Sequence, residues 1–516
     1  MDMEESFEIP DLDEIQDLGS AKFLLKLLLK SSEQQAQTIT KLSTTIEQLR
    51  HELAEVSRAL FGQKSERVVP INREIARRVR AVETPEQAAE RLAKSKAKRD
   101  AKREQRRDST PTEVIEHQVD ARFCRGCGAS LEDADALSDE VSEEYEFVPA
   151  RVIRREHRRH RLVCNCGCFT KGDLPARVVE GGLYGPGLHA HVVVAKCADS
   201  TPLDRQARGF KRADVPLSKS TLCDLFHRTA EHLSPISEEI LRLVASSSHI
   251  NADETSIKIQ TKDECRRGFL WDFIAKNDNG HTMVAYRFSP TRSGHTPIEV
   301  LGDSTGVLQV DGFTGYNKVT TPEKRDRAGC WAHARRKFFA ALETSPKPAE
   351  HAIDLIRQIY EIEYEAAEKD FLGNDKHRAL RNIKSRKIVD EFMTWAKEQK
   401  AQQRPKSPLG VALTYVVNQQ KTLELFLDDP KVRLDNNIAE QHLRLIALGR
   451  KNFLFVGHDE AGRNLATLQT LVSTCLANEI NPQTYLTDVL LRIQDHPQSQ
   501  LAQLLPWNWA IEPRSQ

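Results

Sequence analysis

Residues 249–260 read HINADETSIKIQ, and residues 306–313 read GVLQVDGF. The first stretch alternates apolar and polar residues at period two, which predicts a half-buried β-strand. Two more strand-like runs follow it, GFLWDFIA and HTMVAYRFS, and a short helix candidate, TPIEVL, leads into GVLQVDGF. A long helix, AGCWAHARRKFFAALE, comes next. Three strands, a helix, a fourth strand and a helix in this order predict an α/β core.

Two acids lie on the predicted strands of this core, and a third lies in a helix that follows it. Asp253 lies on the first strand, and Asp311 ends the fourth strand just before a glycine. Glu440 lies in DNNIAEQHLRLIALGRKN, a helix-like segment whose start is signalled by Asp435, Asn436 and Asn437. The first and fourth strands of one sheet can be neighbours, and a later helix can pack over both. We therefore expect the three carboxylates to converge and to hold two Mg²⁺ or Mn²⁺ ions, about 4 Å apart.

We expect the catalytic domain to cover residues 247–475, which includes all three acids. Glu440 follows Asp311 by 440 − 311 = 129 residues, and this long gap needs an insertion. The segment of about 346–430 is charged and mostly helical in pattern, so it is the expected insertion. Residues 476–516 look like a short helical C-terminal domain.

A cysteine module occupies 116–176. Cys124 and Cys127 form a C-x-x-C-G knuckle, and the segment CNCGC over 164–168 supplies the second cluster. Four thiolates at such turns predict a structural Zn²⁺ site. We expect Cys164 and Cys166 as the second pair, because Gly167 then stands where Gly128 stands in the first knuckle, with Cys168 as the alternative ligand.

The N-terminal part, 1–83, carries an acidic start and then a heptad seam. Seven apolar residues between 39 and 60 fall at alternating steps of three and four: Ile39, Leu42, Ile46, Leu49, Leu53, Val56 and Leu60. This predicts a coiled coil and self-association, with an amphipathic helix packed on its own domain as the alternative. Residues 84–115 form a basic linker that either contacts phosphate or serves as a solvated spacer.

Formal net charge is zero, with 75 basic and 75 acidic residues, yet the bases are clustered. The run RVIRREHRRHR over 151–161 lies inside the cysteine module, and the helical segment 177–246 resembles a helix-turn-helix or a plain helical domain. Further bases follow the second and third acids. The residues that we expect to contact DNA are Arg154, Arg155, Arg158, Arg159, Arg335, Arg336, Lys337, Arg444, Arg450 and Lys451. For Arg444, an ion pair with Glu440 one turn earlier is the alternative.

The first twenty residues are acidic rather than basic and then apolar, so we expect no signal peptide. No apolar run approaches the roughly 18 residues of a membrane span. These features predict a cytoplasmic protein.

The blocks HINADETSIKI, VLQVDGFTGYNKV, GCWAHARRKFF and LDNNIAEQHLRLIALGRKNFLFVGHDEAGRN resemble those of the insertion-sequence sixty-six transposases. The resemblance covers nearly the whole chain. It implies a DDE transposase with a ribonuclease-H-like core, in which Asp253, Asp311 and Glu440 are the three acids. It also implies an N-terminal zipper, a zinc finger, a short C-terminal domain and two small accessory proteins of the same element. Cys330 and His333 match the C-x-x-H element that often follows the second acid.

The expected fold is therefore multidomain α+β, and the expected activity is cleavage of the element's terminal repeats and transfer of the freed 3′-hydroxyl to target DNA. Two other functions remain open at this point. One is a ribonuclease-H-like nuclease that does not join strands. The other is an inactive, regulatory DNA-binding relic of a transposase.

Overall fold

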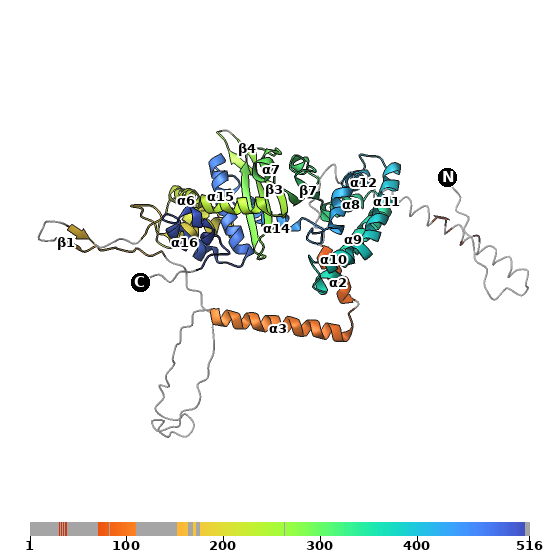
Figure 1. Ribbon diagram of the computed structural model, residues 1–516, viewed down its shortest axis with the longest axis horizontal. Helices are drawn as coiled ribbons and strands as arrows, with labels where there is room; N and C mark the ends of the chain where they lie inside the picture. The colour runs from red at the N-terminus through yellow and green to blue at the C-terminus, as the bar shows by residue number, and fades with distance from the viewer. Residues whose placement is uncertain are drawn as a thin grey trace, which may run out of the picture. The chain divides into compact units, whose positions relative to one another are not determined.

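The computed structural model describes residues 71–81, 83–109, 152–163, 169–171, 176–262 and 264–510, with a few isolated positions before residue 39. The chain divides into two compact units, both drawn in Figure 1. One unit includes Gly329–Asp435, and the other includes Ile71–Ala328 and Asn436–Gln516. The heptad seam and the five cysteines of the predicted zinc module lie outside the described residues.

A five-stranded mixed sheet forms the centre of the second unit (Figure 1). Its strands are β3 (His249–Gln260), β4 (Cys265–Lys276), β5 (Thr282–Ser289), β6 (Gly306–Gln309) and β7 (Arg325–Ala328), in the spatial order β5-β4-β3-β6-β7. The first three strands pair antiparallel, whereas β6 runs parallel to β3 and β7 runs parallel to β6. The prediction that the first and fourth strands are neighbours is confirmed. Helix α7 (His295–Leu301) lies between β5 and β6 in the chain, as expected.

The fifth strand, β7, is absent from the sequence prediction, which begins a helix at Ala328. Its four residues, RDRA, carry three charges and give no strand pattern. Tertiary contacts explain it. The guanidinium of Arg325 is buried, at 1% exposure, and donates to the carbonyl oxygens of Ala245 and Ser247 at 2.7 and 3.0 Å. Because these carbonyls end helix α6 (Lys219–Ser246), one arginine joins the edge of the sheet to that helix.

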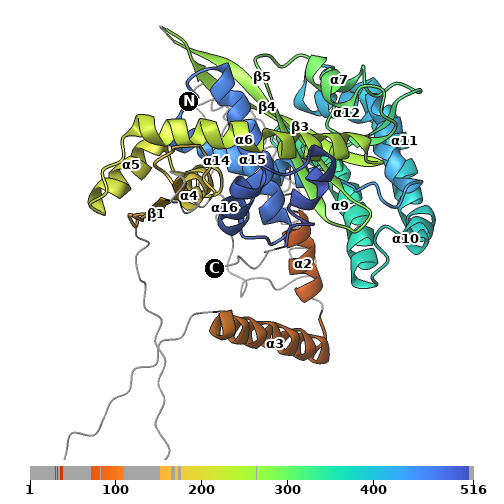
Figure 2. The same cartoon turned by 60° about the vertical axis from the view of Figure 1, so that its left-hand side comes forward.

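Five further helices pack around this sheet and α6. They are α4 (Pro186–Cys197), α5 (Leu203–Arg212), α14 (Asn437–Phe453), α15 (Asp459–Ala477) and α16 (Pro482–Arg492), and Figure 2 shows α6, α14 and α15 beside the strands. Ser218 caps α6, accepting from the backbone N–H of Thr221 at 3.0 Å, as its sequence position suggests. A single hydrophobic core runs from α4 and α6 through the sheet to α15 and α16. The segments 177–246 and 476–510 thus share the core of the sheet.

Helix α15 also covers the exposed edge of β5 with its own side chains. The backbone N–H groups of Val284 and Tyr286 donate to the hydroxyls of Thr474 and Thr470, at 3.2 and 2.9 Å. The hydroxyl of Thr474 donates back to the carbonyl oxygen of Val284 at 3.0 Å. An edge strand left unpaired is a template for aggregation, so these threonines close the sheet on that side.

The unit with Gly329–Asp435 is entirely helical over its described residues and includes the predicted insertion. Its helices are α8 (Trp331–Ala341), α9 (Pro346–Glu368), α10 (Asp375–Leu380), α11 (Arg386–Gln402), α12 (Pro408–Asn418) and α13 (Gln420–Glu424). The rings of Trp331 and Phe338 pack edge-on against Phe392, at 5.3 and 5.9 Å between centroids. Ser407 caps α12 at the RPKSPLG interruption that the sequence marks.

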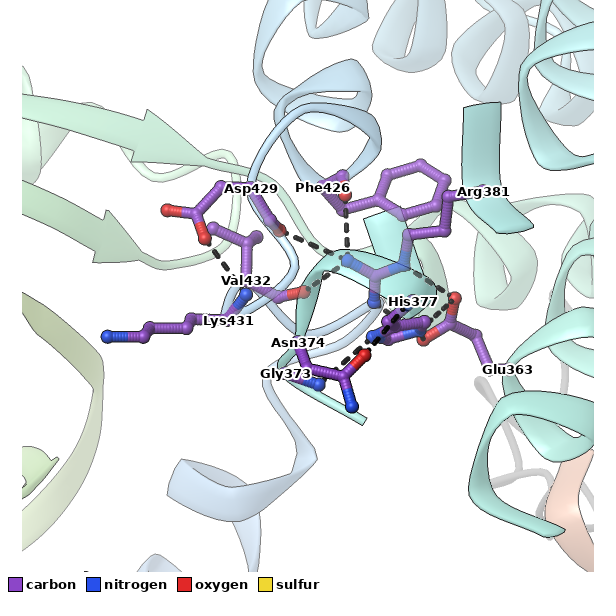
Figure 3. A network of polar contacts seen from close by, with 9 residues as sticks. All are labelled: Glu363, Gly373, Asn374, His377, Arg381, Phe426, Asp429, Lys431 and Val432. Atoms are coloured by element: carbon purple, nitrogen blue, oxygen red, sulfur yellow. Dashed lines mark hydrogen bonds and ion pairs between the residues drawn. The ribbon is translucent and has the colours of Figure 1, made fainter. Parts of the chain in front are cut away.

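Arg381 organises the polar interior of this helical unit (Figure 3). Its guanidinium donates to both carboxylate oxygens of Glu363, at 2.8 and 2.6 Å, and to the carbonyl oxygens of Phe426 and Val432, at 2.7 and 3.1 Å. Burial alone would raise the pKa of Glu363. The hydrogen bonds and positive charges of Arg381 and His377 outweigh this effect and hold the pKa below its ordinary value. The segment that leaves the helical unit is thereby fixed to α9.

Two helices and one hairpin remain. Helix α2 (Ile71–Ala81) buries Ile71 and Ile75, whereas α3 (Pro85–Ser109) is exposed along nearly its whole length, as a charged linker would be. Strands β1 (Arg161–Val163) and β2 (Phe169–Lys171) pair antiparallel on either side of residues 164–168. Among the helices within the described ranges, none is long and apolar enough to cross a membrane.

Candidate active site

Asp253 lies in the middle of β3, directly opposite Asp272 of β4. The backbone N–H of Asp253 donates to Oδ1 of Asp272 at 2.9 Å, so a side chain takes the place of a ladder carbonyl there. The carboxylate of Asp253 accepts in turn from the backbone N–H of Glu254, at 2.9 Å. Asp253 is therefore held by the side chain of Asp272 on β4 and by the backbone of its own strand, which restricts its movement.

Asp311 follows the carboxyl end of β6, the strand next to β3. Its Oδ1 accepts from the backbone N–H of Phe313 at 2.8 Å, which closes a tight turn. Arg327 of β7 donates to the carbonyl oxygens of Asp311 and Phe313, at 2.5 and 2.7 Å, and holds this turn from the other side. The short, charged strand β7 thus positions the second acid.

Glu440 lies in the first turn of α14, and Asn436 anchors that turn. Asn436 is the N-cap residue of the helix, yet its side chain forms no capping hydrogen bond. Instead, its Nδ2 donates to the carbonyl oxygen of Ala252 at 2.8 Å, and its Oδ1 accepts from Asn251 at 2.8 Å. Asn251 also donates to Gln309 of β6 at 3.3 Å. These amides tie together the three elements that carry the three acids.

The electrostatics of Asp253 show that the acids influence one another. Burial, together with the negative charges of Glu254, Asp311 and Glu440, raises the pKa of Asp253 to about 7. Glu254 itself is engaged elsewhere, since it accepts from Arg292 at 2.8 Å and from the hydroxyl of Tyr316 at 2.9 Å. Arg292 therefore neutralises Glu254, which sets Glu254 apart as an acid that is already paired with a cation.

This donor set fits a hard divalent cation. It offers carboxylate oxygens on three braced elements, and a cation would relieve the repulsion that raises the pKa of Asp253. Over the ranges that the structure describes, no three acid, histidine or cysteine side chains are already close enough to enclose one ion. The carboxylates would have to draw together to share a metal.

Asp272 belongs to the same cluster and was missed from the sequence. It is fully buried, and burial raises its pKa well above the ordinary value, with the charge of Asp253 adding to the effect. Its Oδ2 accepts no hydrogen bond from the described residues. The signal was available, because GFLWDFIA places one acid within an otherwise apolar strand and buried acids are rare.

The predicted DNA contacts on α14 divide into exposed and anchored residues. Arg444 and Lys451 are exposed. Arg450 donates to the carbonyl oxygen of Ser256 at 2.5 Å, so it joins the last turns of α14 to β3.

The predicted contacts on α8 and before β1 also differ from one another. The sequence predicts a DNA contact for Arg335, but its side chain is 4% exposed and stacks on Phe339 at 4.4 Å, so we leave it out of the proposed contacts. Arg336 is exposed, and the Lys337 ammonium lies 4.7 Å from the Tyr415 ring. The arginines at 154, 155 and 158 are exposed, Arg159 is half-buried, and Glu156 pairs with Arg154 and Arg158.

Cys330 and His333, the C-x-x-H element, belong to no group of three or more metal-binding side chains among the described residues. Cys330 is buried at the N-cap of α8, where its backbone starts the helix. His333 lies in the first turn of that helix. Cys330 is one of five free cysteines within the described ranges, the others being Cys197, Cys223, Cys265 and Cys475.

Comparison with protein families gives three matches along the chain. The family described as "Transposase IS66 family", a DDE domain, matches residues 181–464, which is more than half of the 516 residues. The IS66 C-terminal element matches 470–507, and the zinc-finger binding domain of transposase IS66 matches 121–167. The last match includes Cys124, Cys127, Cys164 and Cys166 and ends one residue before Cys168.

Three proteins of Sinorhizobium fredii are similar to this chain, and all three carry the description "uncharacterized". Protein y4hP is 31% identical over 408 residues, covering 75% of this chain and 73% of the relative. Protein y4qI is 32% identical, covering 77% of this chain and 75% of the relative. Protein y4jD is 30% identical, covering 76% and 79% respectively.

Proposed function

This chain belongs to the IS66 family of DDE transposases, and on that premise we propose that Asp253, Asp311 and Glu440 cut and join DNA at the element's ends. The observation that carries the proposal is the mutual effect of these acids on the pKa of Asp253, on elements tied together by Asn436. The sheet order, an antiparallel three-stranded part followed by two parallel strands, supports a ribonuclease-H-like core.

The chain's own contribution to the reaction is to hold three charged groups in one place. Asp253 is fixed by β3 and β4, Asp311 by the turn that Arg327 supports, and Glu440 by the anchored start of α14. These residues would hold two Mg²⁺ or Mn²⁺ ions, which activate the attacking oxygen and stabilise the leaving oxygen when bound. Glu254 stays out of this set because Arg292 and Tyr316 occupy its oxygens.

We further propose that Cys124, Cys127, Cys164 and Cys166 bind a structural Zn²⁺. Four thiolates suit tetrahedral zinc, and the zinc-finger match ends before Cys168. The exposed arginines 154, 155 and 158 adjoin strand β1, so a zinc-folded module would present them to DNA phosphates. Arg336, Lys337, Arg444, Arg450 and Lys451 remain proposed contacts elsewhere in the chain.

The wider organisation is proposed on the sequence. The coiled-coil segment in 1–83 would pair copies of the chain, as the joining of two DNA ends requires. The segments 84–115, 116–176 and 177–246 would add DNA affinity to the catalytic segment 247–475, and 476–516 would close its core. The substrates are the terminal repeats and a target DNA, and two small accessory proteins would complete the system.

The test is a cleavage and joining assay on DNA that carries the element's own end, with Mg²⁺ present. Glu440→Gln keeps the size of the side chain and removes the charge, so it should bind DNA and fail to cut. Glu460→Gln, at an exposed position of α15, is the matched control and should cut like wild type.

Each outcome separates one function from another. Equal cutting by wild type and Glu440→Gln would contradict the assignment of the third acid. Cutting without any joined product would favour a nuclease. If wild type binds but neither nicks nor joins, even with the accessory proteins, the chain is a binding protein.

A further inference from the structure

A cleft of about 700 Å³ lies between β3, the start of β4 and the end of α14. Lys258, Arg266, Arg267 and Arg450 line it, and Leu454 lies among them. Of its eight lining residues, four are cationic and none is acidic. Only Arg450 of these was expected from the sequence to contact DNA.

The four cations play two different roles. Arg266 forms an ion pair with Asp459, and Arg450 donates to the carbonyl oxygen of Ser256, so both are fixed in place. Lys258 and Arg267 are exposed, on neighbouring positions of the paired strands β3 and β4. With Asp459 counted against them, the cations leave the cleft with a net charge of +3. Such a concave positive surface attracts polyanions.

The rim of the cleft carries an apolar residue in an unusual conformation. Leu454 ends α14 with φ +59°, a value that favours glycine, and its side chain is 62% exposed. The next residues hold this backbone, because the N–H of Val456 donates to the carbonyl oxygen of Lys258 at 2.9 Å. Strained backbone of this kind tends to occur at ligand-binding sites. Here it places a leucine, followed by the 41% exposed Phe455, beside the cations.

The cleft lies on the same two elements as the acids. Lys258 follows Asp253 by five residues of β3, roughly 17 Å, and this odd separation places the two side chains on opposite faces of the sheet. Arg450 follows Glu440 by ten residues of α14, roughly 15 Å. In B-DNA this separation corresponds to about four to five nucleotides of one strand.

We propose that this cleft binds the DNA strand about four to five nucleotides from the phosphodiester at the acids. Lys258 and Arg267 contact phosphates, and Leu454 packs against a sugar or a base, as apolar residues at DNA-binding surfaces do. A nucleic acid strand offers both the anionic and the apolar surface that the cleft matches. The position along the strand rests on the proposed function, since the acids define the cut.

The test compares DNA binding by full-length variants as a function of salt concentration. Lys258→Gln/Arg267→Gln removes two exposed charges from the cleft, and Lys276→Gln/Lys397→Gln removes two exposed charges elsewhere. The slope of log affinity against log salt should fall by about two for the first variant. It should not change for the second. Leu454→Gly keeps the backbone conformation and should weaken binding without changing the slope.

Hydroxyl-radical footprinting on the terminal DNA gives the location. In the cleft variant, protection should disappear about four to five nucleotides from the cut and persist elsewhere, with thermal stability unchanged. Equal slopes for the two double variants, or an unaltered footprint, would overturn the proposal. If the cleft variant loses this footprint while Glu440→Gln cuts normally, the acid assignment fails and the cleft stands. If Glu440→Gln fails to cut while the cleft variant binds as wild type does, only the cleft proposal fails.

Discussion

The side-chain amide of Asn436 donates a 2.8 Å hydrogen bond to the backbone carbonyl oxygen of Ala252, the residue before Asp253. Asn436 is 1% exposed, so water cannot replace this bond. An asparagine that would ordinarily cap its own helix instead fixes that helix to the neighbouring strand. The placement of Glu440 near Asp253 depends on this contact.

Asn436→Ala should therefore reduce both stability and cleavage. Loss of the amide leaves the Ala252 carbonyl and the Asn251 amide short of a buried partner, which should cost about 1–3 kcal/mol of unfolding free energy. Urea unfolding measures the stability, and the terminal-DNA assay measures the cleavage. Asn279→Ala, in the exposed turn after β4, should change neither. Wild-type cleavage by Asn436→Ala would show that α14 is held in place by other contacts.

The stability of the magnesium-free protein should fall as pH rises from about 4 to 7. The folded-state pKa of Asp253 is raised to about 7 from 3.8, so the folded protein keeps a proton there that the unfolded chain has lost. Tighter proton binding by the folded state stabilises it at low pH, and this contribution disappears as pH rises through 7. Melting temperatures of wild type and Asp253→Asn over this range measure it.

The Asp253→Asn protein should show the shallower fall, because its amide does not titrate. Asp278→Asn, at an exposed position, is the control and should follow wild type. Added Mg²⁺ should raise the melting temperature of wild type most at high pH and that of Asp253→Asn least. Parallel pH profiles for wild type and Asp253→Asn would contradict the raised pKa.

The two substitutions Asp272→Asn and Asp272→Ala should differ. Asparagine keeps an oxygen that can accept from the Asp253 backbone N–H, whereas alanine leaves that buried donor unpaired at a cost of about 1–3 kcal/mol. The free energy of unfolding should accordingly be near wild type for the first and lower for the second. Equal losses for both would mean that the negative charge of Asp272, and not its hydrogen bond, matters.

Replacing Arg381 should strongly destabilise the helical unit. Arg381→Met removes the arginine that pairs with the buried Glu363 and leaves three backbone carbonyls without this donor, which should cost about 3–5 kcal/mol. Arg386→Met breaks an exposed pair with Asp428 and should cost at most about 1 kcal/mol. Urea unfolding of the two variants tests the difference. Similar losses would contradict the special place of Arg381 shown in Figure 3.

Zinc content should distinguish the cysteines of CNCGC. Purified wild type should carry one zinc per chain, measured by elemental analysis. Cys164→Ser and Cys166→Ser should each lose it, and Cys168→Ser should keep it. Retention by Cys166→Ser with loss by Cys168→Ser would make Cys168 the fourth ligand.

Local patterns in the sequence accounted for much of this fold. Period-two alternation in HINADETSIKIQ, the apolar run GFLWDFIA and the helix-start signal at Asn436 each depend on neighbouring residues, and the structure has elements at all of them. The sequence also allowed the pairing of the first and fourth strands, although two strands and a helix separate them in the chain. The choice of Asp253, Asp311 and Glu440 followed from that pairing and from the resemblance in the blocks around them, and their catalytic role stays a prediction.

Other features depend on residues far apart in the chain, and only the tertiary structure decided them. The residues of strand β7 show no strand pattern. The strand is held in place because Arg325 donates hydrogen bonds to the carbonyl oxygens of Ala245 and Ser247, some 80 residues earlier. The sequence predicts that Arg335 contacts DNA, but its side chain is buried. Asp272 was not chosen as a site residue from the sequence, yet it accepts a hydrogen bond from the backbone of Asp253. Charged side chains give the same sequence signal whether they face water or fill a buried site. Apart from β7, the sequence determined where the strands of the sheet lie, whereas the fold determined which charged side chains are removed from water.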